Sequence, residues 1–168
     1  MAGRSRHESI TIYIGALQRA TSCVTPQVYT TPGAYQSRSG LVDVLLGSGE
    51  PVRLRGPGRI HLRVRLRARV TQADPPRGLW DAETAAYEYR ISDQDDREIL
   101  AYHWHPEGRS HVETPHLHLG PAAEVGRTAL LTAHLPTGPV GLHEVLRLAI
   151  ESFEVAPIRS DWEPILRV

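Results

Sequence analysis

Apolar and polar residues alternate without interruption from Arg59 to Val70. The even-numbered positions hold Ile, Leu, Val or Ala, and the odd-numbered positions hold five arginines and one histidine. Successive side chains of a strand point to opposite faces of the sheet, so this pattern is typical of a strand that lies with one face against a core. Residues 59–72 are therefore predicted to form a strand with a basic outer face.

Neighbouring segments have the composition of strands as well. Residues 52–55 are joined to the basic strand by the turn Gly56-Pro57-Gly58, and residues 87–91 alternate again. An acidic turn at residues 92–96 connects the latter segment to residues 97–102. Two alternating runs around a short polar turn predict a hairpin.

The C-terminal part of the chain has helical spacing. Apolar residues from Leu142 to Phe153 recur three and four positions apart, which predicts an amphipathic helix. The segment Ser160-Asp161-Trp162-Glu163 has the form of a capping box and predicts a last short helical turn.

The first 50 residues are less regular. Residues 9–20 fit both a strand and a helix, residues 25–40 have the composition of a loop, and residues 41–46 form a short apolar element. We expect one α+β domain over residues 1–168, built on an antiparallel β-sheet with the C-terminal amphipathic helix packed on one face.

Length and cysteine content favour an ordinary domain of the cytoplasm. A chain of 168 residues can bury a core without disulfides, and Cys23 is its single cysteine, which excludes an intrachain disulfide and a cysteine-based zinc knuckle. The apolar residues 10–14 are soon followed by Gln18 and Arg19, so they are too short a run for a signal peptide. We therefore expect a cytoplasmic protein without a membrane partner.

The basic strand raises the question of what neutralises it. All 19 basic residues of the chain are arginines, balanced by 19 acidic residues. Like charges along one strand face repel each other, so Arg63, Arg65 and Arg67 are candidate contacts to an anion, of which phosphate is the natural one. The alternative is that acidic side chains of a neighbouring strand, such as Glu88 or Glu98, cover this face.

Four histidines form two alternating pairs, His103-Trp104-His105 and His116-Leu117-His118. If both pairs lie on strands, each pair shares one face. A symmetric register would place His105 opposite His116 and His103 opposite His118. Opposed side chains are about 5 Å apart at Cβ, so a patch of four imidazoles is predicted.

Two chemistries would use such a patch. Three or four neutral imidazoles could hold zinc, iron or nickel, whose open coordination position activates water. Without a metal, two histidines could act as general base and general acid on an RNA phosphodiester while arginine stabilises the phosphorane. Tyr87 and Tyr89 would then offer faces for unpaired bases, unless they fill the core instead.

A family resemblance follows from these residues. The run Tyr87-Glu88-Tyr89-Arg90, the acidic turn, the segment from Ile99 to Pro106 and Pro115-His116-Leu117-His118 resemble the central part of TumE-like toxins of bacterial toxin–antitoxin modules. The resemblance covers about residues 59 to 120. It implies a small growth-inhibiting toxin that acts on RNA or translation, with an antitoxin protein as partner that covers the basic face.

The favoured hypothesis is a toxin-like ribonuclease that needs no cofactor. Its catalytic group is His103, His105, His116 and His118, with Arg63, Arg65, Arg67, Tyr87 and Tyr89 as the RNA-binding residues. One alternative is a metal-dependent hydrolase or oxygenase that uses the same four histidines as ligands. Another is a non-enzymatic module that binds nucleic acid or protein through the basic strand.

Overall fold

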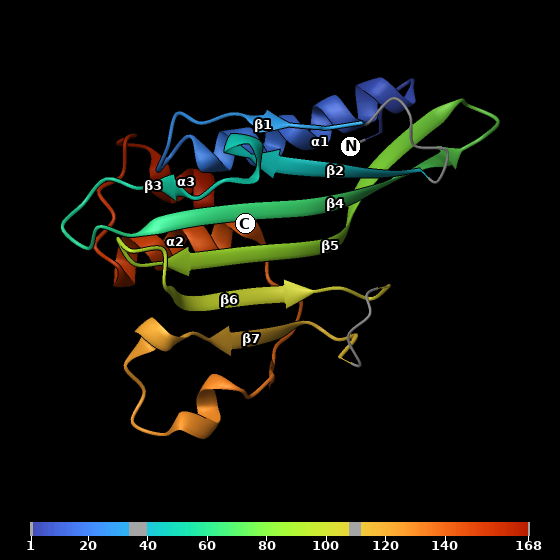
Figure 1. Cartoon of the computed structure of the whole chain (residues 1–168). Helices are drawn as coiled ribbons and strands as arrows, with labels where there is room; N and C mark the ends of the chain where they lie inside the picture. The colour runs from blue at the N-terminus through green and yellow to red at the C-terminus, as the bar shows by residue number, and fades with distance from the viewer. Residues whose placement is uncertain (1, 34–39, 108–111, 168) are drawn as a thin grey trace.

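The fold is seen in a computed structural model, which describes residues 2–33, 40–107 and 112–167. These residues form an antiparallel sheet in the order β1-β2-β4-β5-β6-β7-β8, with β3 paired to β4 beside this path. Helices α1, α2 and α3 lie together on one side of the sheet (Figure 1). The α+β class and the antiparallel sheet predicted from the sequence are confirmed.

The strands occupy the middle of the chain, and the α-helices lie toward its two ends. The strands are β1 (Tyr29–Thr30), β2 (Leu41–Leu46), β3 (Val52–Arg53), β4 (His61–Asp74), β5 (Leu79–Ser92), β6 (Glu98–Trp104), β7 (His116–Leu119) and β8 (Leu135–Pro136). The helices are α1 (Arg6–Thr21), α2 (Leu142–Ser152) and α3 (Trp162–Leu166), with short 3-10 turns η1 (Gly47–Gly49), η2 (Pro121–Ala123) and η3 (Thr128–Leu131). Part of each predicted loop, at residues 34–39 and 108–111, lies outside the described residues.

The long strand β4 is the centre of the sheet. It pairs with β2, β3 and β5, and its apolar positions from Leu62 to Val70 are all buried, as the alternation predicts. Each buried leucine or valine among them contributes about 1.5–3 kcal/mol to folding. The same alternation sends the arginines of β4 to the opposite face.

Helix α1 settles the ambiguity of residues 9–20. Ser5 caps it by accepting a hydrogen bond from the backbone N–H of Glu8 at 3.1 Å, and the Glu8 carboxylate accepts one from the backbone N–H of Arg4. Its inner side buries Ile10 in the core, and the Tyr13 hydroxyl bonds to Thr84 Oγ1 of β5 at 2.7 Å. End capping and packing on the sheet together favour the helix over a strand.

The C-terminal helices match the sequence in part. Helix α2 contributes Leu142, Val145, Leu146 and Ala149 to the core cluster, as its spacing predicts. The predicted capping box at Ser160 is wrong, because α3 begins after Asp161, whose carboxylate pairs with Arg159 at 2.8 Å. Among the described helices, none is long and apolar enough to cross a membrane.

Candidate functional site

The sheet places basic and imidazole side chains in one row. Arg65 of β4 is opposite Glu88 of β5, Glu88 is opposite His103 of β6, and His103 is opposite His116 of β7. Since this row is out of phase with the buried Leu66 and its neighbours, it lies on the face turned away from the helices. We call this surface the open face.

All four predicted histidines meet on the open face. The ring centroid of His103 lies 5.3 Å from that of His105, 5.7 Å from that of His116 and 4.9 Å from that of His118. The centroids of His116 and His118 are 4.9 Å apart. The patch of imidazoles predicted from the two alternating pairs is therefore present.

The predicted register of these pairs is wrong by two residues. His103 is opposite His116, and His118 is opposite Ala101 rather than His103. A shift by two residues preserves the face on which a side chain lies, so the cluster survives the error. His105 follows the last residue of β6 and reaches the cluster from the strand end.

A fifth histidine joins the group from a distant part of the chain. Pro136 of β8 is opposite His116, so His134, two residues earlier, falls beside His118. The His134 ring centroid lies 4.4 Å from that of His118 and 5.1 Å from that of His116. Only the pairing of the two-residue strand β8 reveals this neighbour, and no local sequence signal points to it.

Three of the imidazoles have the arrangement of metal ligands. His103, His116 and His118 each offer a ring nitrogen, and these nitrogens all lie within 4.8 Å of one another. Ligand nitrogens on a tetrahedral ion, with bonds of about 2.0–2.1 Å, lie about 3.4 Å apart. To hold such an ion, the three nitrogens, which lie within 4.8 Å of one another, would approach by up to about 1.4 Å.

Buried His116 is the best-oriented member of the three. Its side chain is 3% exposed, and its Nδ1 lies 2.7 Å from the carbonyl oxygen of Thr114. A carbonyl oxygen accepts, so Nδ1 carries the proton and donates it, which leaves the lone pair on Nε2. A backbone carbonyl of this kind fixes the ring and tautomer of metal-binding histidines.

Electrostatics favours the neutral form of three of the rings, those of His103, His105 and His118. Burial, and then the neighbouring imidazoles led by His118, lower the pKa of His103 to about 4. Burial also lowers the pKa of His105 and of His118, and Glu88 only partly opposes this at His105. Neutral imidazole is the form that binds a metal, whereas a general acid must carry a proton at the working pH.

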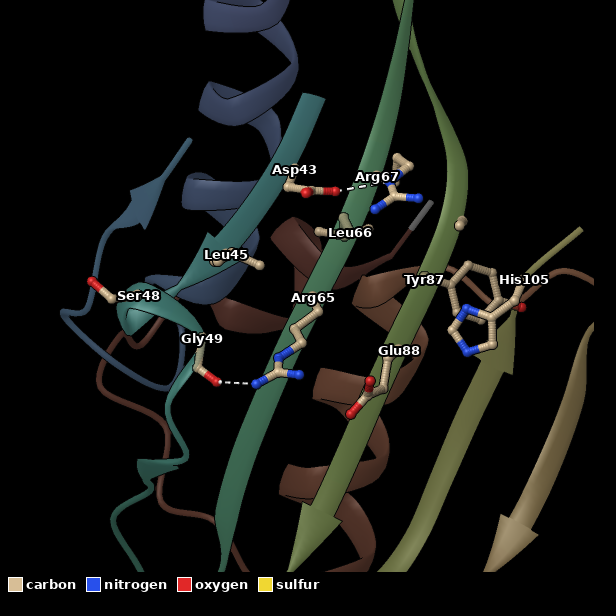
Figure 2. Close-up of a pocket in the computed structure, with 11 residues that line it drawn as sticks. Asp43, Leu45, Ser48, Gly49, Arg65, Leu66, Arg67, Tyr87, Glu88 and His105 are labelled. Atoms are coloured by element: carbon tan, nitrogen blue, oxygen red, sulfur yellow. Dashed lines mark hydrogen bonds and ion pairs between the residues drawn. The ribbon is translucent and has the colours of Figure 1, made fainter. Parts of the chain in front are cut away.

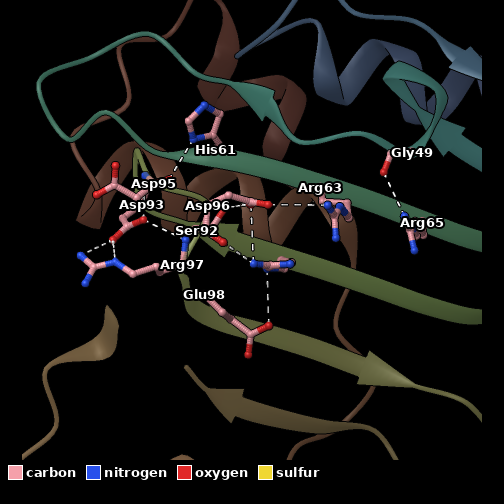
Figure 3. Close-up of polar contacts among 11 residues, drawn as sticks. Gly49, His61, Arg63, Arg65, Ser92, Asp93, Asp95, Asp96, Arg97 and Glu98 are labelled. Carbon is pink, nitrogen blue, oxygen red and sulfur yellow. Dashed lines mark hydrogen bonds and ion pairs between the residues drawn. The ribbon is translucent and has the colours of Figure 1, made fainter. Parts of the chain in front are cut away.

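The arginines of β4 are neutralised in different ways. Arg67 Nε lies 2.8 Å from the Asp43 carboxylate, and this bond raises the pKa of Arg67. Arg63 is mostly covered and lies 3.9 Å from Asp96 (Figure 3). Arg65 donates to the carbonyl oxygen of Gly49 at 3.2 Å. Acidic partners therefore take two of the three predicted phosphate contacts, in line with the alternative interpretation of the strand.

The two tyrosines predicted to stack on bases do not lie on this face. Tyr87 and Tyr89 are 3% and 2% exposed, and their rings stack on each other with centroids 4.7 Å apart. They are opposite Leu66 and Val64 of β4, so strand alternation turns them into the core. The prediction that they offer open faces to bases is wrong, and Glu88 between them takes the open-face position.

Comparisons of this chain with protein-family models, with curated proteins and with solved structures found no match. The resemblance to TumE-like toxins therefore stays a prediction from the sequence.

Proposed function

We propose that this protein is a metal-dependent hydrolase whose ion is held by His103, His116 and His118. The observation that carries the proposal is the convergence of three ring nitrogens within 4.8 Å on one face of the sheet. The oriented Nδ1–H of His116 supports it, because a carbonyl contact of this kind fixes the ring and tautomer of a metal-binding histidine.

Zinc suits this ligand set best. Three neutral imidazoles with an open fourth position are a recurring arrangement of catalytic zinc, whereas non-haem iron oxygenases use two histidines and a carboxylate. In the described part of the chain, the group whose possible ligand atoms all lie within 4.8 Å of one another contains histidines alone. Bound there, zinc would supply a Lewis acid that lowers the pKa of water in its open position.

The surrounding residues have roles that follow from their contacts. The Thr114 carbonyl oxygen holds the His116 ring in place through Nδ1. His105 is next to His103, and its lowered pKa leaves it able to accept a proton at neutral pH. RNA as the substrate and an antitoxin as the partner stay predictions from the sequence.

Metal analysis after dialysis tests this proposal. Protein loaded with zinc and dialysed against metal-free buffer should retain roughly one ion per chain, and it should hydrolyse p-nitrophenyl esters. His118→Asn should lose both the ion and the hydrolysis. His143→Gln on α2 is the matched control and should keep both. Wild-type protein that retains no zinc, nickel or iron after dialysis contradicts the proposal.

A further inference from the structure

A cavity of about 330 Å³ opens on the open face beside the histidine cluster (Figure 2). The small side chain of Ala86 lines it between the longer Arg67 and His105, and Gly49 of η1 lines its opposite side. Arg65, Glu88 and His105 point out from neighbouring strands on the same side of the sheet (Figure 2). The volume is in the range of small-molecule sites.

The charged side chains that line this cavity differ in whether they have a partner of opposite charge. Asp43 is engaged by Arg67 at 2.8 Å. Arg65 is exposed, and its guanidinium has a single hydrogen bond within the described part of the chain, to the Gly49 carbonyl oxygen. Arg65 and Glu88 are direct cross-strand neighbours, yet they form no ion pair within 4.0 Å among the described residues. The other donors of the Arg65 guanidinium are therefore available to a ligand.

The position of Arg65 relates the cavity to the proposed metal ligands. Arg65 on β4 and His103 on β6 are separated by two strand spacings, which corresponds to about 10 Å. Glu88 lies between them on β5 and adds a negative charge midway. The Glu88 carboxylate would repel a chain of closely spaced phosphates. A ligand with one anionic end, held at Arg65, would carry no negative charge next to Glu88.

We propose that this cavity binds the oxyanion group of a small substrate, a phosphate or a carboxylate, through Arg65. The inference names the substrate class of the proposed hydrolase and rests on that function for the reacting end of the molecule. The reacting bond would lie at the histidine cluster, about 10 Å from the anionic end. A guanidinium with unused donors in a fork geometry is well suited to two oxygens of such a group.

Anion binding to zinc-free protein tests the cavity separately from the metal. Wild-type protein kept in chelator is titrated by calorimetry with inorganic phosphate, acetate and phenyl phosphate. We expect binding of at least one of these probes, and the preferred probe identifies the oxyanion. Arg65→Gln should weaken it about tenfold or more, since it removes a charge-assisted contact. Glu88→Gln should tighten it severalfold because a like charge is removed.

Arg147→Gln on α2 is the matched control and should bind as the wild type does. Absence of binding by all three probes, or equal affinity of wild type and Arg65→Gln, overturns the proposal. Tighter binding of a single-stranded RNA oligonucleotide that depends on Arg63 as much as on Arg65 also overturns it, in favour of RNA. Because the protein is zinc-free, these outcomes are distinct from failure of the metal site, which zinc retention reports.

Discussion

The open face has an arginine half on β4 and a histidine half on β6 and β7. Repulsion between neighbouring cationic groups is relieved differently in the two halves. On β4, cations lie next to one another, and acids supplied by neighbouring segments pair with them: Asp43 with Arg67, Asp96 with Arg63 and Glu107 with Arg69. On β6 and β7, imidazoles crowd together, and burial with mutual repulsion lowers the pKa of His103, His105 and His118. The arginine half therefore stays charged, whereas the neutral form is favoured for His103, His105 and His118 in the histidine half.

This difference shows what each half can bind. Among the described arginines of β4, Arg63, Arg67 and Arg69 have carboxylate partners, whereas Arg65 bonds to a neutral carbonyl oxygen and keeps its charge for an anion. Neutral imidazoles repel no cation and present lone pairs to it. We therefore expect the open face to bind an anion and a cation about 10 Å apart.

Loss of His116 is expected to have the largest effect. His116→Ala removes the best-oriented ligand, and zinc affinity should fall about 100-fold or more. His61→Ala is a matched control, because His61 Nδ1 also contacts a backbone carbonyl oxygen, that of Asp93 at 2.9 Å, but in the arginine half (Figure 3). Calorimetric titration with zinc measures both variants. Equal losses in the two variants would show that the effect is structural rather than ligation.

Zinc should also stabilise the fold. A ligand that binds the native state alone adds about 2.7 kcal/mol to the free energy of unfolding at 100 times its Kd. We expect urea melts to shift to higher denaturant with zinc and to return with chelator. The Arg65→Gln variant should show the same shift, since it leaves the three ligands in place. No shift in wild-type protein would mean that zinc binds the native chain no more tightly than the unfolded one, which contradicts a metal site in the fold.

The pH dependence of the stability of zinc-free protein should reveal the lowered pKa of His103. His103 has a pKa of about 4 in the folded chain and 6.5 as its ordinary value. Between these values the unfolded chain takes up a proton that the folded chain excludes, so the free energy of unfolding falls as the pH decreases from 6.5 to 4. The slope stays below the limit of about 1.4 kcal/mol per pH unit for one proton, because the difference in bound protons between the two states is less than one.

His103→Gln should flatten this slope, while carboxylates titrate alike in both proteins and cancel in the difference. Urea melts at several pH values supply the measurement. An identical pH dependence in the two proteins would show that His103 protonates as easily in the folded chain as in the unfolded one.

The smallest effect is expected for Asp43→Asn in the arginine half. The Asp43–Arg67 pair is about half exposed, so its loss should cost less than about 1 kcal/mol of stability. The freed Arg67 guanidinium lines the same cavity as Arg65, so phosphate affinity should increase modestly. Thermal melting and phosphate titration check both. Weaker phosphate binding in this variant would argue against a cationic role for Arg67.

The sequence predicted the parts of this fold that depend on local pattern. Alternation located β4 and assigned its two faces, and helical spacing located α2. β4 and α2 could be predicted because their period is set by neighbouring residues. The apolar spacing of residues 9–20 fits a strand as well as a helix, so the sequence left α1 open, and its cap at Ser5 and its packing on the sheet favour the helix.

The candidate site depended on contacts between distant segments and was predicted only in part. Alternation brought four histidines to one face, but the register of β6 and β7 is set by tertiary pairing that spacing does not reveal. The same lack of tertiary information favoured an exposed position for Tyr87 and Tyr89, which lie in the core, and it left His134 outside the predicted catalytic group. Alternation along a strand predicts which residues share a face, whereas contacts with the rest of the chain determine which face is buried.

The X-ray absorption spectrum of zinc-loaded protein tests the central claim most directly. A site formed by His103, His116 and His118 should give a nitrogen or oxygen shell at about 2.0–2.1 Å with the outer-shell scattering of three imidazoles. His118→Asn should reduce that imidazole scattering or lose the ion. A spectrum without imidazole scattering, or one that is unchanged in His118→Asn, would contradict a metal site in the histidine cluster.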